Sequence, residues 1–275
     1  MTTHPIEKLL RGLRRVLGIR ESRSNLSLQS RLYTAFLELI TLGRGIPRAI
    51  NGELELHLLP SCRFLSSSYE PDVWNWLKQR TVPGSIILDV GAQVGLYSML
   101  AARHIGADGR VFAFEPSPDT VNMLRRHLTN NGMTNRVEIV QAAVGPEEGE
   151  VTFYMAGTHP CNTMAPTTVD PVKLTPVKVK AVTVDGFCCQ RQLKPSILKI
   201  DVEGWELQVL RGATQVVQDP ALTICVEMHP YAWESAGYTA ADFTSFVEAN
   251  GFEIVPLTGQ SSPLTEYGEV WLKRK

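Results

Sequence analysis

From residue 85 onward, short apolar runs alternate with segments of helical periodicity. Such runs are typical of buried strands, and strands that alternate with helices predict a mostly parallel sheet with helices on both faces. The expected strands cover residues 85–90, 110–114, 137–143, 149–153, 177–184, 196–200, 222–226, 253–257 and 269–273, and the expected helices cover 94–105, 119–130, 206–210 and 241–250. The alternation predicts an α/β fold of the Rossmann-like kind.

The first part of the chain has a different pattern. Helices are expected over 28–42 and 70–80, and a strand over 53–59 after an Asn51-Gly52 turn. Residues 155–176 contain four prolines and little periodicity, so we expect an irregular insertion there. We therefore divide the chain into an N-terminal helical extension (1–50) and one large domain (51–275).

Charge and cysteine content exclude some functions. A net charge of -1 and a pI near 6.6 argue against nucleic-acid binding. Five cysteines, an odd number without C-x-x-C spacing, indicate reduced thiols and a cytoplasmic protein.

The first 31 residues are strongly basic, with seven Lys or Arg against two Glu. Five apolar residues fall there at helical spacing: Leu9, Leu10, Leu13, Val16 and Leu17. Together they predict a basic amphipathic helix, which has two interpretations. It either packs on its own domain or contacts a membrane surface or a partner.

A glycine-containing loop, Asp89–Gly95, joins the first buried strand to a helix. Ligands in such sheets bind beyond the carboxyl ends of the strands, and residues without a Cβ allow close approach. The loop lacks the G-x-G-x-x-G spacing of dinucleotide sites. An acid at Asp89 suits an ammonium group, and Gly91 and Gly95 suit a carboxylate, so the loop favours S-adenosylmethionine (SAM) over NAD.

Two further strand ends complete the expected cofactor site. Glu115 ends the second strand, where an acid accepts hydrogen bonds from ribose hydroxyls. Gln141 and Ala142 end the third, where a small residue leaves room for adenine and an amide can bond its edge.

Ionisable residues follow the next two strands. Asp201 and Glu203 come after one, and Glu227 and His229 after the other. Positions i and i+2 share a face in extended backbone, so we expect the four groups to converge if the strands are neighbours. Asp201, Glu203 and His229 are the candidates for positioning and deprotonating an acceptor, and Asp201 also for contacting the cofactor. The same oxygens would suit Mg²⁺, but no metal is predicted.

Several segments together resemble the FkbM-type methyltransferases: ILDVGAQVGLYS (87–98), GRVFAFEPSP (109–118), LKIDVEGWE (198–206) and VEMHP (226–230). The resemblance covers roughly residues 53–257, and the first of its motifs is Tyr69-Glu70-Pro71. It implies a Rossmann-like class I methyltransferase fold with a mostly parallel, seven-stranded sheet. It also implies SAM contacts from Asp89, Gly91, Gly95 and Glu115, to which we add Glu70. Family members usually have Asn at the position of Gln93.

The expected activity is O-methylation of a hydroxyl on a sugar, glycolipid or other small natural product. The alternatives are an NAD(P)-dependent oxidoreductase and a non-catalytic nucleotide-binding protein of the same fold. The sequence leaves the oligomeric state open.

Overall fold

The computed structural model describes residues 28–167 and 173–275. The chain falls into two compact units, which are described separately. The smaller unit contains Met1–Pro71 and Arg126–Met133, and the larger contains Asp72–Arg125 and Thr134–Lys275. The proposed domain boundary at residues 50 and 51 remains a prediction.

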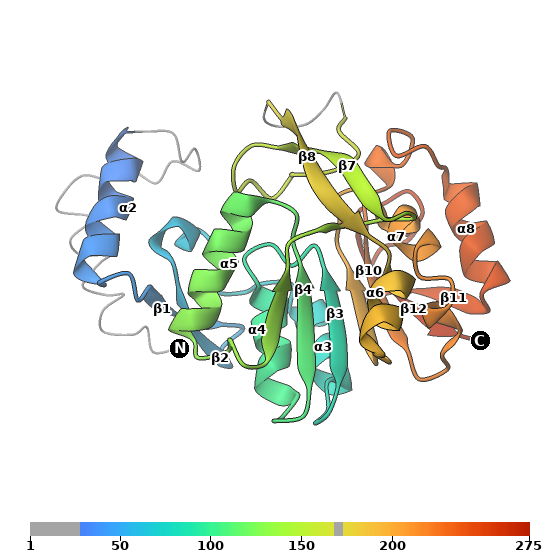
Figure 1. Ribbon diagram of the computed structural model, residues 1–275, viewed down its shortest axis with the longest axis horizontal. Coiled ribbons are helices and arrows are strands. Elements are labelled where there is room, and N and C mark those ends of the chain that lie inside the picture. The colour runs from blue at the N-terminus through green and yellow to red at the C-terminus, as the bar shows by residue number, and fades with distance from the viewer. Residues whose placement is uncertain (1–27, 168–172) are drawn as a thin grey trace. The chain divides into compact units, whose positions relative to one another are not determined.

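The larger unit is built on one sheet, in which seven of the described strands follow the order β11-β12-β10-β9-β3-β4-β5 (Figure 1). Their bounds are β3 (Ile86–Val90), β4 (Arg110–Phe114), β5 (Val137–Val140), β9 (Ile197–Ile200), β10 (Thr223–Met228), β11 (Phe252–Pro256) and β12 (Gly268–Arg274). The neighbouring strands β5, β4, β3, β9 and β10 are parallel to one another. β12 is antiparallel to both of its neighbours, β10 and β11. This topology confirms the predicted class I methyltransferase fold.

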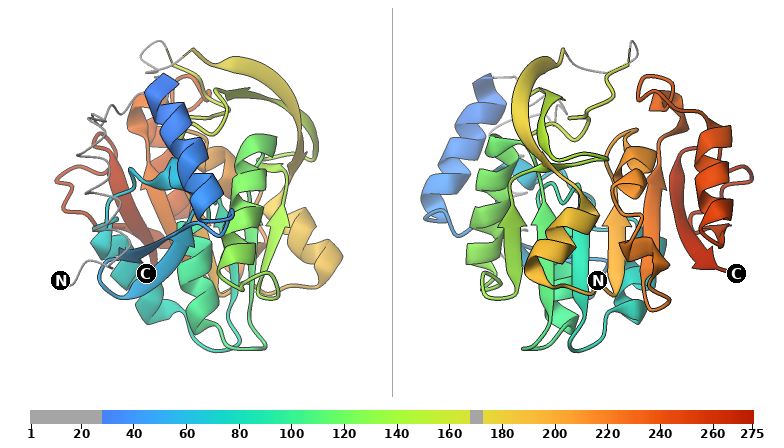
Figure 2. Two further views of the ribbon diagram at one scale, coloured as in Figure 1. Left: turned by 90° about the vertical axis from the view of Figure 1, so that its left-hand side faces the viewer. Right: turned by 45° about the vertical axis from the view of Figure 1, so that its right-hand side comes forward.

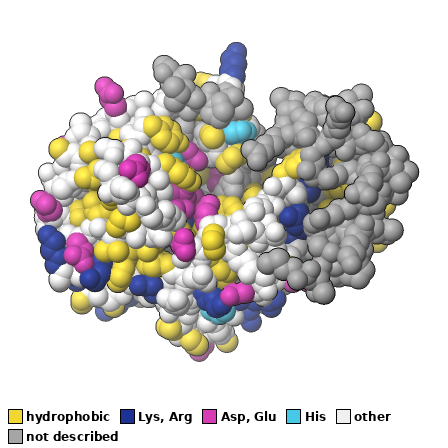
Figure 3. Space-filling model, turned by 180° about the vertical axis from the view of Figure 1, so that it is seen from behind, with side chains coloured by type: hydrophobic (Ala, Val, Ile, Leu, Met, Phe, Trp, Pro, Cys, Tyr) yellow, Lys and Arg dark blue, Asp and Glu magenta, His cyan; other side chains and the backbone are white. Residues whose placement is uncertain are grey.

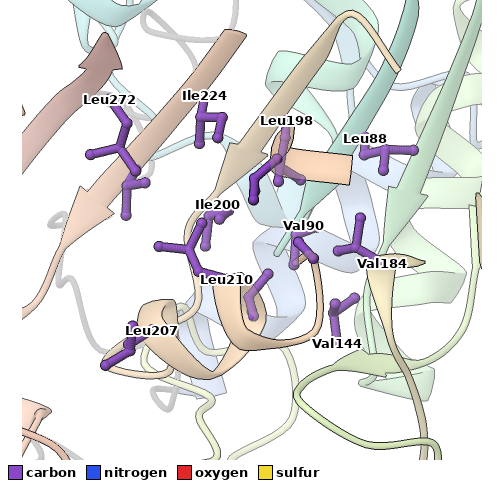
Figure 4. Packing of buried hydrophobic residues seen from close by; sticks show 14 of the residues in the cluster. Leu88, Val90, Val144, Val184, Leu198, Ile200, Leu207, Leu210, Ile224 and Leu272 are labelled. Atoms are coloured by element: carbon purple, nitrogen blue, oxygen red, sulfur yellow. The ribbon is translucent and has the colours of Figure 1, made fainter. Parts of the chain in front are cut away.

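Helices cover both faces of this sheet, as predicted. They are α3 (Pro71–Arg80), α4 (Leu96–His104), α5 (Pro118–Asn130), α6 (Val184–Arg191), α7 (Glu206–Arg211) and α8 (Ala240–Ala249). In Figure 1 and in the right-hand view of Figure 2, α6 lies in front of the sheet, whereas α3 and α4 lie behind it in Figure 1. Apolar side chains of α6, α7 and α8 share one buried cluster with the strands, including Leu88, Leu198, Leu207 and Leu210 (Figure 4).

A second, smaller sheet follows β5 along the chain. Three described strands form it in the order β6-β8-β7, with β6 (Ala143–Val144), β7 (Gly149–Met155) and β8 (Thr175–Val182). The strands expected over 149–153 and 177–184 therefore exist but lie outside the main sheet. The strand expected over 137–143 ends at Val140, since the chain leaves the main sheet to form β6.

The smaller unit contains α2 (Leu28–Ile40) and an antiparallel hairpin of β1 (Ile46–Ile50) and β2 (Leu54–Leu58). The helix and the second strand were predicted, whereas β1 was not. The predicted basic amphipathic helix lies outside the described residues. Within the described ranges, no helix is long and apolar enough to cross a membrane.

Candidate active site

The candidate site lies in the larger unit, at the edge of the sheet where the parallel strands end. β9 pairs with β3 on one side and with β10 on the other. β9 and β10 are therefore neighbours in the sheet. This is the condition on which the predicted convergence of the ionisable groups depended. Seen from behind, acidic side chains gather near the middle of the described surface (Figure 3).

Asp89, near the end of β3, is almost completely buried. The Ser98 hydroxyl, from α4, donates to its Oδ2 at 2.6 Å. Its Oδ1 is buried and has no hydrogen-bond partner in the described part of the chain. Burial raises the pKa of Asp89, while Lys199 and Ser98 act in the opposite direction. Buried acceptors are normally satisfied, so this oxygen suits a donor from a ligand.

Glu115 follows β4 directly, and its carboxylate connects the loop between β3 and α4 to the end of that strand by a hydrogen bond. Its carboxylate accepts from the backbone N–H of Ser117 at 2.8 Å and of Gln93 at 3.2 Å. The N–H groups of Gly91 and Ala92 donate to the carbonyl of Phe114. Burial raises the pKa of Glu115 to about 7.

Gly91 and Gly95 have positive φ angles of 83° and 89°, which favour glycine. A Cβ on Gly91 would overlap the carbonyl oxygen of Asp201, and one on Gly95 would overlap the Leu124 side chain. The two glycines thus give the loop its conformation and let it pack against the protein. Whether their backbone also contacts the cofactor remains a prediction.

Three further residues were predicted to contact the cofactor: Glu70, Gln141 and Ala142. Ala142 is buried just after β5, and its N–H donates to the Val140 carbonyl at 2.9 Å. Gln141 is exposed at the same strand end. Glu70 belongs to the smaller unit and has a φ of 37°. Their cofactor contacts remain predictions.

Four ionisable groups do converge at the ends of β9 and β10. The Nε2 atom of His229 lies 3.5 Å from Oε2 of Glu203 and 3.7 Å from Oε1 of Glu227. Single atoms of Asp201, Glu227 and His229 lie within 4.8 Å of one another, a spacing that could hold a metal ion. The Nζ atom of Lys199 lies 3.3 Å from Oδ2 of Asp201. The cluster therefore already contains two nitrogen groups that carry positive charge when protonated.

The surroundings of His229 raise the pKa of its ring. Burial lowers its pKa, but the hydrogen bond from Nδ1 to Glu206 and the charges of Glu206, Glu203 and Asp201 raise it to about 10. The net effect favours an imidazolium near neutral pH. A general base must be unprotonated, so this environment favours a positioning role for His229 over the basic role that its ordinary pKa suggested.

Glu203 and Asp201 are the two partly exposed carboxylates of the cluster, with side chains that are 22% and 24% exposed, against 7% for Glu227. The φ of Glu203, 51°, places it in the left-handed region. Burial and the Asp201 charge raise its pKa to about 7, against the opposing effects of His229 and a 3.1 Å hydrogen bond from the Tyr231 hydroxyl.

The pKa values of the other two carboxylates, Glu227 and Asp201, are shifted in opposite directions. Burial, together with Asp201, raises the pKa of Glu227 well above its ordinary value, and the Tyr267 hydroxyl donates to its Oε1. Burial also opposes ionisation of Asp201, but Lys199 and His229 outweigh it and lower its pKa. Glu203 is the carboxylate that combines partial exposure with a pKa near neutrality.

Glu206 is the site residue that sequence reasoning missed. It is fully buried and accepts hydrogen bonds from four groups. These are the Gly204 N–H at 2.8 Å, the His229 ring at 2.8 Å, the Trp233 indole at 2.8 Å and the Tyr238 hydroxyl at 2.9 Å. The signal for it was a second acid three residues after Glu203, which was interpreted only as the start of a helix.

Comparison with known proteins gives relatives that are methyltransferases. The hexuronic acid methyltransferase AglP of Haloferax volcanii is 28% identical over 166 residues, which cover 58% of this chain and 62% of that protein. The match thus spans less than two thirds of the Haloferax protein. Methyltransferase sdnD of Sordaria araneosa is 26% identical over 196 residues, covering 61% of this chain and 73% of that protein.

Among solved structures, a methyltransferase FkbM from Methylobacillus flagellatus matches with a TM-score of 0.47 and 13% identity. The match covers 98% of this chain and 71% of that one. The sequence profile of the methyltransferase FkbM domain matches residues 89–254, which is more than half of the chain. The chain therefore belongs to the FkbM methyltransferase family, and its cofactor is SAM.

Proposed function

We propose that the chain transfers the methyl group of SAM to a hydroxyl of a sugar, glycolipid or related small natural product. The observation that carries this proposal is Glu203, a partly exposed carboxylate with a pKa raised to about 7 at the end of the sheet. The 28% identity to a hexuronic acid methyltransferase supports a carbohydrate acceptor.

The residues at the ends of β3 and β4 fit SAM. In the proposal, the open Oδ1 of Asp89 accepts a hydrogen bond from the cofactor's ammonium group. Glu115 accepts from the ribose hydroxyls, and the Gly91–Gly95 loop faces the carboxylate. When bound, SAM supplies a methyl group activated by its sulfonium.

Glu203 then acts as the general base in this proposal. A hydroxyl has a pKa far above 7, so its proton must leave as the oxygen attacks rather than before. Glu203 accepts this proton, which a carboxyl of pKa near 7 can hold and later release to water. General-base catalysis typically contributes about 10²–10⁴-fold to the rate.

The charged neighbours position this base. His229, fixed at Nδ1 by Glu206, directs Nε2 toward Glu203 and Glu227. Lys199, buried beside Asp201, holds that carboxylate ionised. Asp201 is thereby available to orient the acceptor hydroxyl or to contact the cofactor.

A labelling experiment tests the proposal. The full chain is incubated with SAM carrying a labelled methyl group and with neutral sugars, uronic acids and their glycosides, and the products are separated by mass spectrometry. We expect label on at least one carbohydrate, and about 10²-fold less with Glu203→Gln. Glu248→Gln, an exposed α8 change, is the matched control. Transfer that is equal in both variants would contradict the role of Glu203, and label found only on proteins or nucleic acids would contradict the acceptor class.

A further inference from the structure

Helix α2 presents an apolar face at the surface of the smaller unit. Its members are Leu32, Phe36, Leu39 and Ile40, joined by Leu42 just after the helix, with exposed fractions of 62%, 41%, 71%, 49% and 78%. The spacing of these positions places them along one side of the helix. A contiguous exposed apolar face of this kind marks an interaction surface.

The adjoining side of α2 packs against the rest of its own unit. Tyr33 and Leu37 form a buried cluster with Ile46 of β1. The Arg63 guanidinium donates to the Thr34 hydroxyl at 2.7 Å and to the Ser30 hydroxyl at 2.6 Å. These contacts fix the rotation of the helix, so the apolar face is held outward rather than free to turn inward.

We propose that this face, hereafter the α2 face, docks onto the surface of an anionic phospholipid bilayer. The sequence immediately before and at the start of α2 supplies the electrostatic part of the interaction. Residues 1–31 carry seven basic and two acidic residues. Basic segments beside an exposed apolar helix face bind interfaces through charge attraction and apolar burial together.

Charge also favours a bilayer over a second copy of the chain. The one acid in the α2 sequence, Glu38, pairs with Arg126 at 2.6 Å, so the helix itself carries no unpaired acid that an anionic bilayer would repel. A second copy of the chain, docked through the same face, would bring two basic segments together at a cost in repulsion. An anionic bilayer matches both the apolar face and the basic segment.

Vesicle binding of the full-length protein tests this proposal without involving the active site. The probes are sedimenting vesicles of phosphatidylcholine alone and of phosphatidylcholine with roughly 30% phosphatidylglycerol. The double substitution Leu32→Gln/Leu39→Gln removes the centre of the α2 face. Val82→Gln, which changes a residue that is 55% exposed in the larger unit, is the matched control. Circular dichroism and SAM affinity report whether each variant is folded.

We expect the wild-type protein to bind the anionic vesicles more tightly than the neutral ones. The double variant should bind them at least about tenfold more weakly, and the Val82 variant should bind like the wild type. Absence of wild-type binding to anionic vesicles would overturn the proposal, as would equal binding by the folded double variant. A dimer in sedimentation velocity that the double variant abolishes would assign the face to a second copy and equally overturn it.

Discussion

The ring of His229 is fixed by Glu206, whose Oε1 lies 2.8 Å from the ring Nδ1, and both side chains are almost wholly inaccessible to water. The bond leaves Nε2 directed at Glu203 and Glu227. A buried acid therefore fixes the orientation of His229 and raises its pKa. A carboxylate that fixes the tautomer and orientation of a functional histidine is a recurring arrangement.

Glu206→Gln should destabilise the fold and lower the pKa of His229. The amide nitrogen would face groups that already donate, leaving a buried donor unsatisfied at a cost of about 2–4 kcal/mol in the free energy of unfolding. Loss of the negative partner should move the His229 pKa below its value of about 10. Urea denaturation and a proton NMR titration of the ring measure the two effects.

The exposed acid Glu253, paired with Lys273 at 2.6 Å, provides the control. Glu253→Gln should leave both the free energy of unfolding and the His229 titration almost unchanged, because exposed pairs contribute little. An unshifted His229 titration in a folded Glu206→Gln protein would show that Glu206 does not set the charge of the ring.

The turnover rate should rise with pH through the pKa of Glu203. Its folded-state pKa lies near 7, above the ordinary value, so the carboxyl is protonated and unable to accept a proton below that pH. We expect kcat to increase from about pH 6 to about pH 8 and then to level off. In Glu203→Gln this rise should disappear and kcat should fall by about 10²-fold. A Glu203→Gln profile that keeps the same rise would assign the titration to another group.

Asp89→Asn should weaken SAM binding with little loss of stability. The substitution keeps the size and the Ser98 contact but removes the charge that faces the cofactor's ammonium in the proposal. The expected loss is roughly tenfold to a hundredfold in Kd, measured by calorimetry. Asp108→Asn, an exposed change before β4, is the matched control. If the Asp89→Asn protein bound SAM with unchanged affinity, Asp89 would not be the residue that accepts from the ammonium group.

Chelators should leave the reaction unaffected. Single atoms of Asp201, Glu227 and His229 lie within 4.8 Å of one another, which is close enough to bind one metal ion. However, Lys199 lies beside Asp201, and the raised pKa of His229 favours a protonated ring next to the carboxylates. These two cations already offset the negative charge that would attract Mg²⁺. Turnover measured with excess chelator should equal turnover with added Mg²⁺. Inactivation by the chelator, reversed by Mg²⁺, would instead establish a metal-assisted reaction.

The main sheet was predictable because its strands are short apolar runs that end in loops. β9 is the clearest example, since all four of its residues are buried. β1 was missed because Pro47 and Arg48 interrupt its apolar pattern, and a hairpin strand tolerates both. α6 was missed because Gly186 and a pair of cysteines give it almost no amphipathic pattern. Its start is fixed by the Thr183 side chain, which accepts from the Gly186 N–H.

The convergence of Asp201, Glu203, Glu227 and His229 was predictable from the sequence, but their charges and the part played by Glu206 were not. Strand ends meet at one edge of a parallel sheet, so the positions of Asp201 and His229 could be anticipated from the order of residues. The ordinary pKa of histidine suggested a base, whereas the folded chain surrounds the ring with carboxylates. Glu206 acquires its partners only in the folded chain, which brings Trp233 and Tyr238 to it from later segments.

The central claim is that the methyl group goes to a hydroxyl, and one measurement tests it most directly. The product formed from SAM with a carbon-13 methyl group is analysed by NMR before and after mild alkali. The proposal predicts an O-methyl signal that survives alkali, as an ether does. Release of the label as methanol would show that a carboxylate is esterified, and an N-methyl signal would show that nitrogen is the acceptor; either result would contradict the proposal.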